Sequence, residues 1–236
     1  MSIRSRSLAA AAATLALSAV AAPGANAVLG DDQQTGDIVN GQYATDTQGA
    51  VSMSLSDGSA WCSGSLLTPT KVLTAQHCTD GLGVQQYYFR VGSLSRESGG
   101  TVHKATKVQV QNDVAVVTLA TPATGAKTVT LATTEPAVGD TNQLYGWGRT
   151  GYSDPASPRL KYTNVPVTSL NARDAYGGPA IQTGVGDGHA WKGDSGGPQF
   201  ANGKQVGVCS VGVFGEYQNY SSVPKNLAFI KAAAGI

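Results

Sequence analysis

The chain has 236 residues, of which 16 are Lys or Arg and 15 are Asp or Glu, so its formal net charge is +1. This balance leaves no basic surface of the kind that binds nucleic acid or an anionic membrane. Only 13% of the residues are charged, whereas 30 are glycine. Alternating Val, Thr and Leu runs between Gly, Pro, Asn and Asp predict an all-β protein of many short strands.

The first 27 residues have the three parts of a secretory signal peptide. A basic start, "MSIRSRS", precedes the apolar run "LAAAAATLALSAVAA", and "ANA" ends at Ala27 as a small-residue cleavage site. The apolar run is shorter than the roughly 20 residues that a membrane span needs. We therefore expect a secreted, extracellular protein, with residues 28–37 ("VLGDDQQTGD") as a polar pro-segment.

Short apolar runs after residue 38 predict two β-rich halves, separated by a Pro-, Thr- and Gly-rich connection over residues 120–141. The run "SSVPKNLAFIKAAAGI" predicts a C-terminal helix, because Pro224 lies near its start and Leu227 and Ile230 follow at helical spacing. The strands are expected around "AVSMSL", "WCSGSLL", "KVLTA", "QYYFRVG", "KATKVQV", "DVAVVTL", "NQLYGWG", "LKYTNVPV", "GPQF" and "KQVGVCSVGV".

The three cysteines predict one disulfide in an oxidising compartment. Cys62 and Cys78 are the expected pair, since they flank one hairpin-like segment. Closing a loop of this size contributes roughly 3 kcal/mol in the chain-entropy model. Cys209 lies in an apolar strand, and we expect it to be a small buried hydrophobic residue.

The segment "GDSGG" places Ser195 in a glycine-rich turn, which makes it a candidate nucleophile. A serine hydroxyl needs a general base, and the base needs an orienting carboxylate. Among His77, His103 and His189, the first has the best local context, beside an expected disulfide cysteine. Asp113 is the candidate carboxylate, because it opens the apolar run "VAVVTLA"; an acidic residue that merely ends a turn is the plain alternative.

Six ordered motifs from Ile38 onward make the chain resemble the chymotrypsin/trypsin family of serine proteases, of the bacterial secreted kind. These motifs are "IVNG", "LTAQHC", "NDVAVVTL", "LYGWGRT", "GDSGGP" and "CSVG". The resemblance implies two antiparallel six-stranded β-barrels and a short C-terminal helix. The peptidase domain would span 38–236, with the first barrel over about 38–135 and the second barrel and helix over about 136–236.

The same resemblance implies the parts of a peptide-cleaving site. His77 would be the general base, Asp113 its orienting carboxylate and Ser195 the nucleophile, and the backbone N–H groups of Gly193 and Ser195 would form the oxyanion hole. The residues implied for the substrate pocket are His189, Ala190, Lys192, Ser210, Val211 and Gly212.

Activation would follow from a cut before Ile38, whose free amino group would pair with Asp194. A buried carboxylate without its partner costs on the order of 3–5 kcal/mol, so we expect the precursor to lack a formed oxyanion hole. Asp194 as a simple turn residue is the alternative. No metal or other cofactor is implied, because "RVGSLSRESGGTVHK" has no counterpart of the family's acidic calcium loop.

Substrate specificity remains open among three alternatives, because His189 stands where trypsin-like members carry an aspartate. A histidine at the pocket floor with Lys192 at its entrance would favour an acidic residue before the cut, and Asp37 would then permit self-activation. A second alternative is a small or apolar residue, with His189 simply hydrogen-bonded. A third is Arg or Lys, if Asp187 turns into the pocket.

Two other functions compete with the endopeptidase. A catalytically silent homologue acting as a binding protein would lose a triad residue, but all three candidates are present. An esterase of the α/β-hydrolase type would have the order Ser, Asp, His, whereas this chain has His, Asp, Ser. We expect polypeptide substrates, proteinaceous inhibitors as further partners, no nucleic acid or membrane partner, and a monomer.

Overall fold

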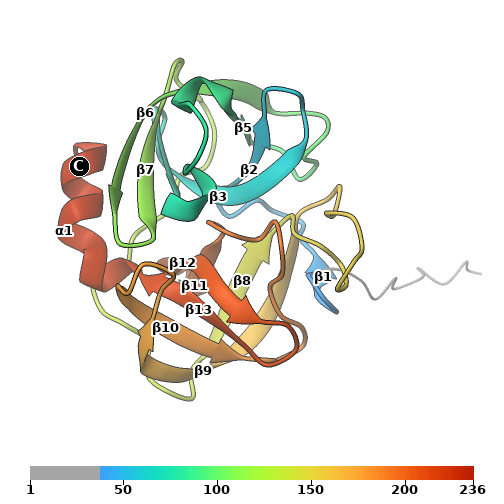
Figure 1. Ribbon diagram of the computed structural model, residues 1–236, viewed down its shortest axis with the longest axis vertical. Coiled ribbons are helices and arrows are strands. Elements are labelled where there is room, and N and C mark those ends of the chain that lie inside the picture. The colour runs from blue at the N-terminus through green and yellow to red at the C-terminus, as the bar shows by residue number, and fades with distance from the viewer. Residues whose placement is uncertain (1–37) are drawn as a thin grey trace, which may run out of the picture. The chain divides into compact units, whose positions relative to one another are not determined.

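The computed structural model describes residues 38–236, so the expected signal peptide (1–27) and pro-segment (28–37) lie outside the described residues. Within this range the chain forms thirteen strands, two short 3₁₀ helices and one α-helix (Figure 1). The strands close into two antiparallel barrels of six strands each, which confirms the predicted fold.

The first barrel closes in the order β2-β3-β4-β7-β6-β5. Two 3₁₀ helices, η1 and η2, lie between β4 and β5. The bounds of these elements are β2 Ala50–Leu55, β3 Ala60–Thr68, β4 Lys71–Thr74, η1 Gln76–Cys78, η2 Val84–Gln86, β5 Tyr87–Val91, β6 Thr101–Gln111 and β7 Val114–Leu119.

The second barrel follows the order β9-β10-β13-β12-β11-β8 and closes through the pairing of β8 with β9. The two-residue strand β1 adds to its edge by pairing with β9, so the first residues of the described chain join the second barrel. The bounds are β1 Gln42–Tyr43, β8 Thr141–Gly146, β9 Lys161–Arg173, β10 Pro179–Gly184, β11 Pro198–Ala201, β12 Lys204–Val213 and β13 Tyr217–Ser222.

Every predicted strand is present, and β1, β10 and β13 are additional to the prediction. Burial in β5 and in the first half of β9 alternates residue by residue, as the two-residue period of a strand requires. β13 shows no such alternation, because five of its six residues are buried. Its sequence, "YQNYSS", is polar and therefore does not predict a strand. Its neighbours β10 and β12 decide its structure.

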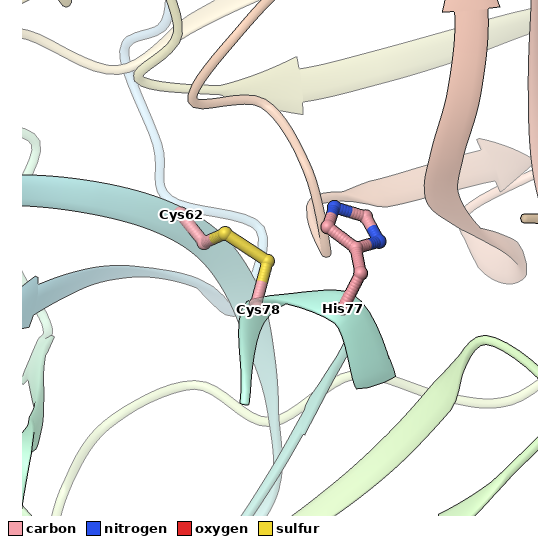
Figure 2. A group of neighbouring side chains, drawn as sticks. All are labelled: Cys62, His77 and Cys78. Atoms are coloured by element: carbon pink, nitrogen blue, oxygen red, sulfur yellow. A yellow bond between two sulfur atoms is a disulfide. The ribbon is translucent and has the colours of Figure 1, made fainter. Parts of the chain in front are cut away.

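One disulfide joins Cys62 of β3 to Cys78 of η1, as predicted. It ties the helical turn that carries His77 to the barrel wall, and the imidazole lies beside the disulfide (Figure 2). The indole N–H of Trp61 also donates to the carbonyl oxygen of Cys78 at 2.8 Å. The backbone of this turn is therefore fixed at its C-terminal end by a covalent and a polar contact.

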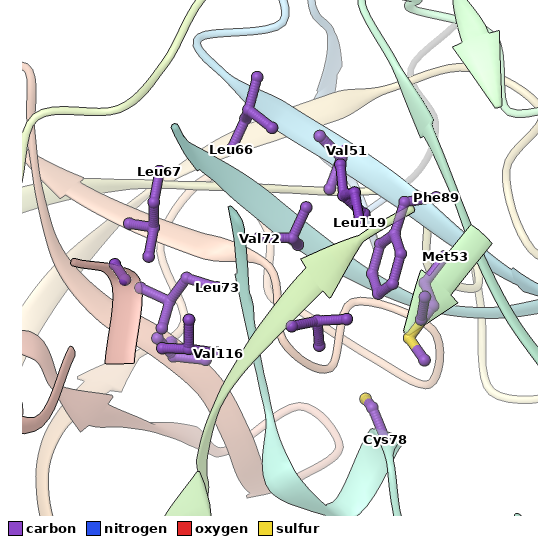
Figure 3. Packing of buried hydrophobic residues seen from close by; sticks show 14 of the residues in the cluster. Val51, Met53, Leu66, Leu67, Val72, Leu73, Cys78, Phe89, Val116 and Leu119 are labelled. Carbon is purple, nitrogen blue, oxygen red and sulfur yellow. The ribbon is translucent and has the colours of Figure 1, made fainter. Parts of the chain in front are cut away.

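The largest apolar cluster fills the first barrel and continues beneath the C-terminal helix (Figure 3). Leu66, Val72, Leu73 and Phe89 are fully buried there. Burial of one such side chain contributes about 1.5–3 kcal/mol, so this cluster is a principal source of stability.

The α-helix α1 (Val223–Ala234) closes the chain, as predicted. The side chain of Ser222 caps its N-terminus by accepting a hydrogen bond from the Lys225 amide, and Gly235 ends it in the left-handed conformation. It packs against β6 and β7 of the first barrel and β12 and β13 of the second. Among residues 38–236, no helix has the length and apolar character that crossing a membrane requires.

Asn226 of α1 holds the turn between β6 and β7, the turn that carries Asp113. Its side-chain oxygen accepts hydrogen bonds from Asn112 at 2.8 Å and Gln111 at 3.3 Å, and its amide donates to the Ser222 carbonyl at 2.8 Å. Asn226 is 1% exposed, so these groups have little access to water. The helix thereby fixes the position of a candidate site residue from outside the barrel.

We predict that Asn226→Ala lowers the free energy of unfolding by about 1–3 kcal/mol, because it leaves buried polar partners unsatisfied. The exposed Lys231→Ala in the same helix is the control and should change it by less than about 0.5 kcal/mol. Urea unfolding followed by tryptophan fluorescence measures both. Equal effects of the two substitutions would show that the Asn226 contacts do not stabilise the turn.

Candidate functional site

The carboxylate of Asp113 and the imidazole of His77 form the centre of the candidate site. His77 Nδ1 lies 2.8 Å from Asp113 Oδ2, and the His77 backbone N–H donates to Asp113 Oδ1 at 2.9 Å. A third donor, the hydroxyl of Ser210 in β12, lies 2.6 Å from Asp113 Oδ2. Asp113 is fully buried while His77 is partly exposed, so the imidazole is the member of the pair that reaches solvent.

The backbone around Asp113 is braced from the second barrel. Asn112 has a φ of 54°, a left-handed conformation that Asn tolerates, and this turns the chain sharply into β7. Asp174 accepts a hydrogen bond from the Asp113 amide at 3.2 Å and another from Ser221 at 3.0 Å. Sequence reasoning missed Asp174, because nothing near it in the chain marks it as a partner of Asp113.

Ser195 lies in a loop that the first barrel holds in place. The Ser63 amide donates to the Ser195 carbonyl at 2.8 Å, and the Ser63 hydroxyl donates to the Gly193 carbonyl at 2.9 Å. Gly196 has a φ of 79°, and a Cβ there would collide with Thr74, three residues before His77. These contacts place the loop beside the turn that carries His77.

Gly193 adopts a φ of 99°, which favours glycine. Its carbonyl points to Ser63, and the Ser63 hydroxyl also accepts a hydrogen bond from the Trp147 amide at 3.2 Å. Ser63 therefore links the Gly193 loop to the "GWG" segment. It is a positioning residue that sequence reasoning did not identify.

Asp194 is a second buried carboxylate, and it lies inside the second barrel. It accepts hydrogen bonds from the amides of Gly148 at 2.7 Å and Trp191 at 2.8 Å. A Cβ at Gly146 or Gly148 would collide with this carboxylate, which explains the two glycines of "GWG". Burial raises the pKa of Asp194 to about 7, although the two amides and the charge of Lys161 act in the opposite direction.

Ile38 is 1% exposed and packs into a core cluster with Leu144, Ala190 and Tyr220. The next residue, Val39, forms an antiparallel bridge with His189, whose amide donates to the Val39 carbonyl at 3.1 Å. The start of the described chain is therefore packed against the segment that leads to Asp194.

The structure distinguishes the two candidates for the pocket floor. His189 is 3% exposed, and its Nδ1 donates to the Ala190 carbonyl at 3.0 Å. Asp187 is exposed, and its carboxylate accepts a hydrogen bond from the Asn164 side chain at 2.8 Å. The third specificity alternative, with Asp187 turned into the pocket, thus has no support in this conformation.

Four aromatic rings, one of them that of His189, pack into one cluster. Phe214 meets His189 edge to face with ring centroids 4.8 Å apart, and it meets Trp191 at 4.9 Å and Tyr152 at 5.3 Å in the same way. Tyr152 also stacks on Trp191 at 5.8 Å. This cluster joins three loops through ring contacts alone. Aromatic pairs contribute about 0.5–1.5 kcal/mol beyond their burial.

The other residues predicted for the pocket differ in their surroundings. Ala190 is fully buried, Gly212 is half-buried and Val211 is 44% exposed. Lys192 is exposed. The Ser210 hydroxyl donates to the Asp113 carboxylate and accepts a hydrogen bond from the Ala175 amide. Its side chain therefore supports the carboxylate.

The remaining histidine and cysteine candidates have structural environments. His103 is buried between the hydroxyls of Thr101 at 2.7 Å and Thr121 at 2.9 Å. Cys209 is free and buried as predicted, and burial raises the pKa of its thiol. Cys62, His77 and Cys78 lie close enough to resemble a metal site, but the two sulfurs are joined in a disulfide and offer no thiolate.

Comparisons with known proteins agree with this geometry. A model of the trypsin family matches residues 38–231. Trypsin beta of Drosophila erecta is 31% identical over 222 residues, which cover 85% of this chain and 88% of the relative. Trypsin alpha of Drosophila melanogaster is also 31% identical over 222 residues, covering 85% of this chain and 87% of the relative.

Solved structures share the fold at lower identity. An inactivated protease paralogue of the scabies mite superposes with a TM-score of 0.75 at 24% identity, covering 84% of this chain and 97% of its own. Human heparin binding protein has a TM-score of 0.74 at 20% identity, covering 84% of this chain and 96% of its own. From the family model and the trypsin relatives, the chain belongs to the trypsin family and is a serine endopeptidase.

Proposed function

We propose that this protein is a secreted endopeptidase that cleaves peptide bonds through an acyl-enzyme formed on Ser195, with His77 as base and Asp113 as its orienting carboxylate. The observation that carries the proposal is the buried Asp113 carboxylate, 2.8 Å from His77 Nδ1, beside the braced loop of Ser195. Hydrogen bonding at Nδ1 fixes the tautomer in which Nε2 accepts a proton.

Each group has one role in the proposed reaction. Ser195 Oγ attacks the peptide carbonyl while His77 Nε2 takes its proton, and the N–H groups of Gly193 and Ser195 bind the oxyanion. His77 then gives the proton to the leaving amine as the C–N bond breaks. Water hydrolyses the ester by the same steps, and the buried negative charge of Asp113 stabilises the imidazolium in both.

A catalytically silent binding protein is the alternative, and two structural neighbours are described as an inactivated paralogue and a heparin binding protein. Those likenesses are below 25% identity and concern the fold. The contact of His77 with Asp113 and the braced Ser195 loop support catalysis here, because a silent homologue has no need of either.

We predict that protein beginning at Ile38 reacts with a serine-directed phosphonate at Ser195, and that Ser195→Ala abolishes labelling and lowers kcat by about 10⁶-fold. Mass spectrometry of tryptic peptides locates the label, and an internally quenched peptide measures kcat. Ser153→Ala, in an exposed loop, is the control and should leave both unchanged. An unlabelled Ser195 in folded protein would contradict the proposal.

We further propose that a cut between Asp37 and Ile38 activates a zymogen. The freed ammonium group of Ile38 would pair with Asp194, the carboxylate whose pKa burial raises. Support comes from the buried side chain of Ile38 and from its bridge-forming neighbour Val39, which already pack as the cleaved chain would need.

The ion pair makes stability respond to pH differently before and after the cut. In the uncut chain the Asp194 carboxyl has a pKa of about 7, against a value of about 4 when unfolded. Between these pH values the folded chain holds the extra proton, so its free energy of unfolding falls as pH rises, by on the order of 4 kcal/mol. In the cut chain, pairing with the Ile38 ammonium group would lower the pKa of Asp194 in the folded state. The free energy of unfolding would then fall much less as pH rises.

Urea unfolding from about pH 4 to about pH 7.5 measures this difference on Ser195→Ala protein, cut and uncut. We expect the steeper fall with pH in the uncut form. Adding Asp194→Asn to the uncut form removes the titrating group and should flatten the curve. The same slope in the cut and uncut forms would refute the ion pair.

For specificity, we propose that a small or apolar residue precedes the cut. The Nδ1 hydrogen of His189 is already donated to Ala190, and the Phe214 ring packs against the imidazole. Both contacts make His189 part of the pocket wall and leave it less available to bind an acidic side chain. A basic side chain is not favoured either, because the Asp187 carboxylate lies exposed to solvent and is held by the Asn164 side chain.

A peptide series varied only at the residue before the cut checks this prediction. We expect kcat/KM for Ala or Leu to exceed that for Arg by at least about tenfold, since a buried cation without a partner costs more than 1.4 kcal/mol. Glu in the same position tests the acidic alternative, which would be supported if Glu were the best residue. Preferred cleavage after Arg would contradict the proposal and would support the alternative in which Asp187 binds a basic side chain in the pocket.

A further inference from the structure

A groove is lined at one point by Gly193, and none of its lining residues belongs to β12. It has a volume of about 440 Å³. One wall comes from the start of β3, with Trp61 and Cys62, and the other from the segments of Arg149 and Lys192. The two segments of the second wall are joined, because the Arg149 amide donates to the Lys192 carbonyl at 2.8 Å.

The charge of this groove is one-sided. Three cationic residues, Arg96, Arg149 and Lys192, line it, and no acidic residue does. The whole chain is nearly neutral, with 16 basic and 15 acidic residues, so the groove concentrates a charge that the composition does not predict. Such a surface attracts negatively charged groups.

Two of the three cations are available to a ligand. Among the described residues, the Arg149 guanidinium takes part in no hydrogen bond or ion pair and is half-buried. Lys192 is exposed, and its Nζ lies 5.8 Å from the Trp191 ring. Arg96 is committed, because it donates to the Ser157 carbonyl at 3.0 Å and pairs with Glu97 at 3.0 Å.

The position of the groove decides which part of a peptide enters it. Ser210, Val211 and Gly212 of β12 are predicted to line the pocket for the residue before the cut, and in the proposed reaction the carbonyl to be attacked lies at Gly193. No residue of β12 lines the groove, whereas Gly193 does. An extended peptide that passes Ser195 therefore places the residues after the cut in this groove.

We infer that this protease selects substrates with an acidic side chain at the first or second residue after the cut, and that Arg149 and Lys192 recognise it. The inference rests on the proposed endopeptidase function. Arg149 supplies a planar fork that matches a carboxylate, and Lys192 a mobile point charge. Trp61 and the Cys62 disulfide form the apolar side, which contacts the methylene part of a Glu side chain.

The chain's own activation junction lacks this feature. The residues after Asp37 are Ile38, Val39, Asn40 and Gly41, and none of them is acidic. If the groove favours an acidic residue after the cut, the enzyme cleaves its own activation junction more slowly than a substrate that carries such a residue.

The test uses protein beginning at Ile38, with active molecules counted by phosphonate titration. Internally quenched peptides share every residue up to the cut and carry Glu, Gln or Lys at the first or the second position after it. We expect kcat/KM for Glu to exceed that for isosteric Gln by about fivefold at low salt, and Lys to be the poorest. Salt near 1 M, where the Debye length is about 3 Å, should remove most of the difference.

Variants assign the preference to the groove. Arg149→Gln with Lys192→Gln should bring the Glu-to-Gln ratio close to one, and Arg149→Glu should favour Lys over Glu. Lys204→Gln, which removes one positive charge at the exposed start of β12, is the control and should keep the ratio. A flat ratio in the unmodified enzyme, or an unchanged ratio in the double variant, would overturn the inference while leaving the endopeptidase proposal intact. Failure to cleave any peptide would overturn both.

Discussion

The burial of the Asp113 carboxylate is the constraint on which the arrangement of the site depends. A fully buried carboxylate is stable only when its oxygens accept hydrogen bonds. Here the donors come from His77 in the first barrel and Ser210 in the second. Asp174 and Asn226 fix the surrounding backbone from the second barrel and the helix. Satisfying one charge thus sets the position of both barrels and of the imidazole between them.

Asp194 is also a buried carboxylate, but its partners differ from those of Asp113. It accepts two amide hydrogen bonds, from Gly148 and Trp191, yet burial still raises its pKa to about 7. The difference from Asp113 lies in the partner, since among residues 38–236 no imidazole forms a hydrogen bond with the Asp194 carboxylate. A carboxyl group held near its titration point responds to any cation that arrives, which suits a switch operated by a newly freed ammonium group. In the proposed mechanism, the two buried acids serve two purposes: Asp113 positions the imidazole and Asp194 takes part in activation.

The proposed selectivity depends on features that lie outside the proposed catalytic residues. The rings of Phe214, Trp191 and Tyr152 pack the pocket loops together where a covalent link is absent. On the other side of Gly193, Arg149 and Lys192 give a nearly neutral chain a local positive surface. Both features arise on loops, where side chains can vary more freely than those that fill the two barrels.

The sequence by itself determined the family, most of the strands, the helix and the disulfide, and it predicts His77, Asp113 and Ser195 as the catalytic residues. These follow from local periodicity, spacing and ordered motifs, which neighbouring residues carry. Only the tertiary structure decided the rest: β13 as a strand despite its polar residues, Ser63 and Asp174 as supports, His189 and not Asp187 at the buried position, and the cationic groove. Each of these is a contact between segments far apart in the chain, and such contacts leave no pattern in the residues on either side.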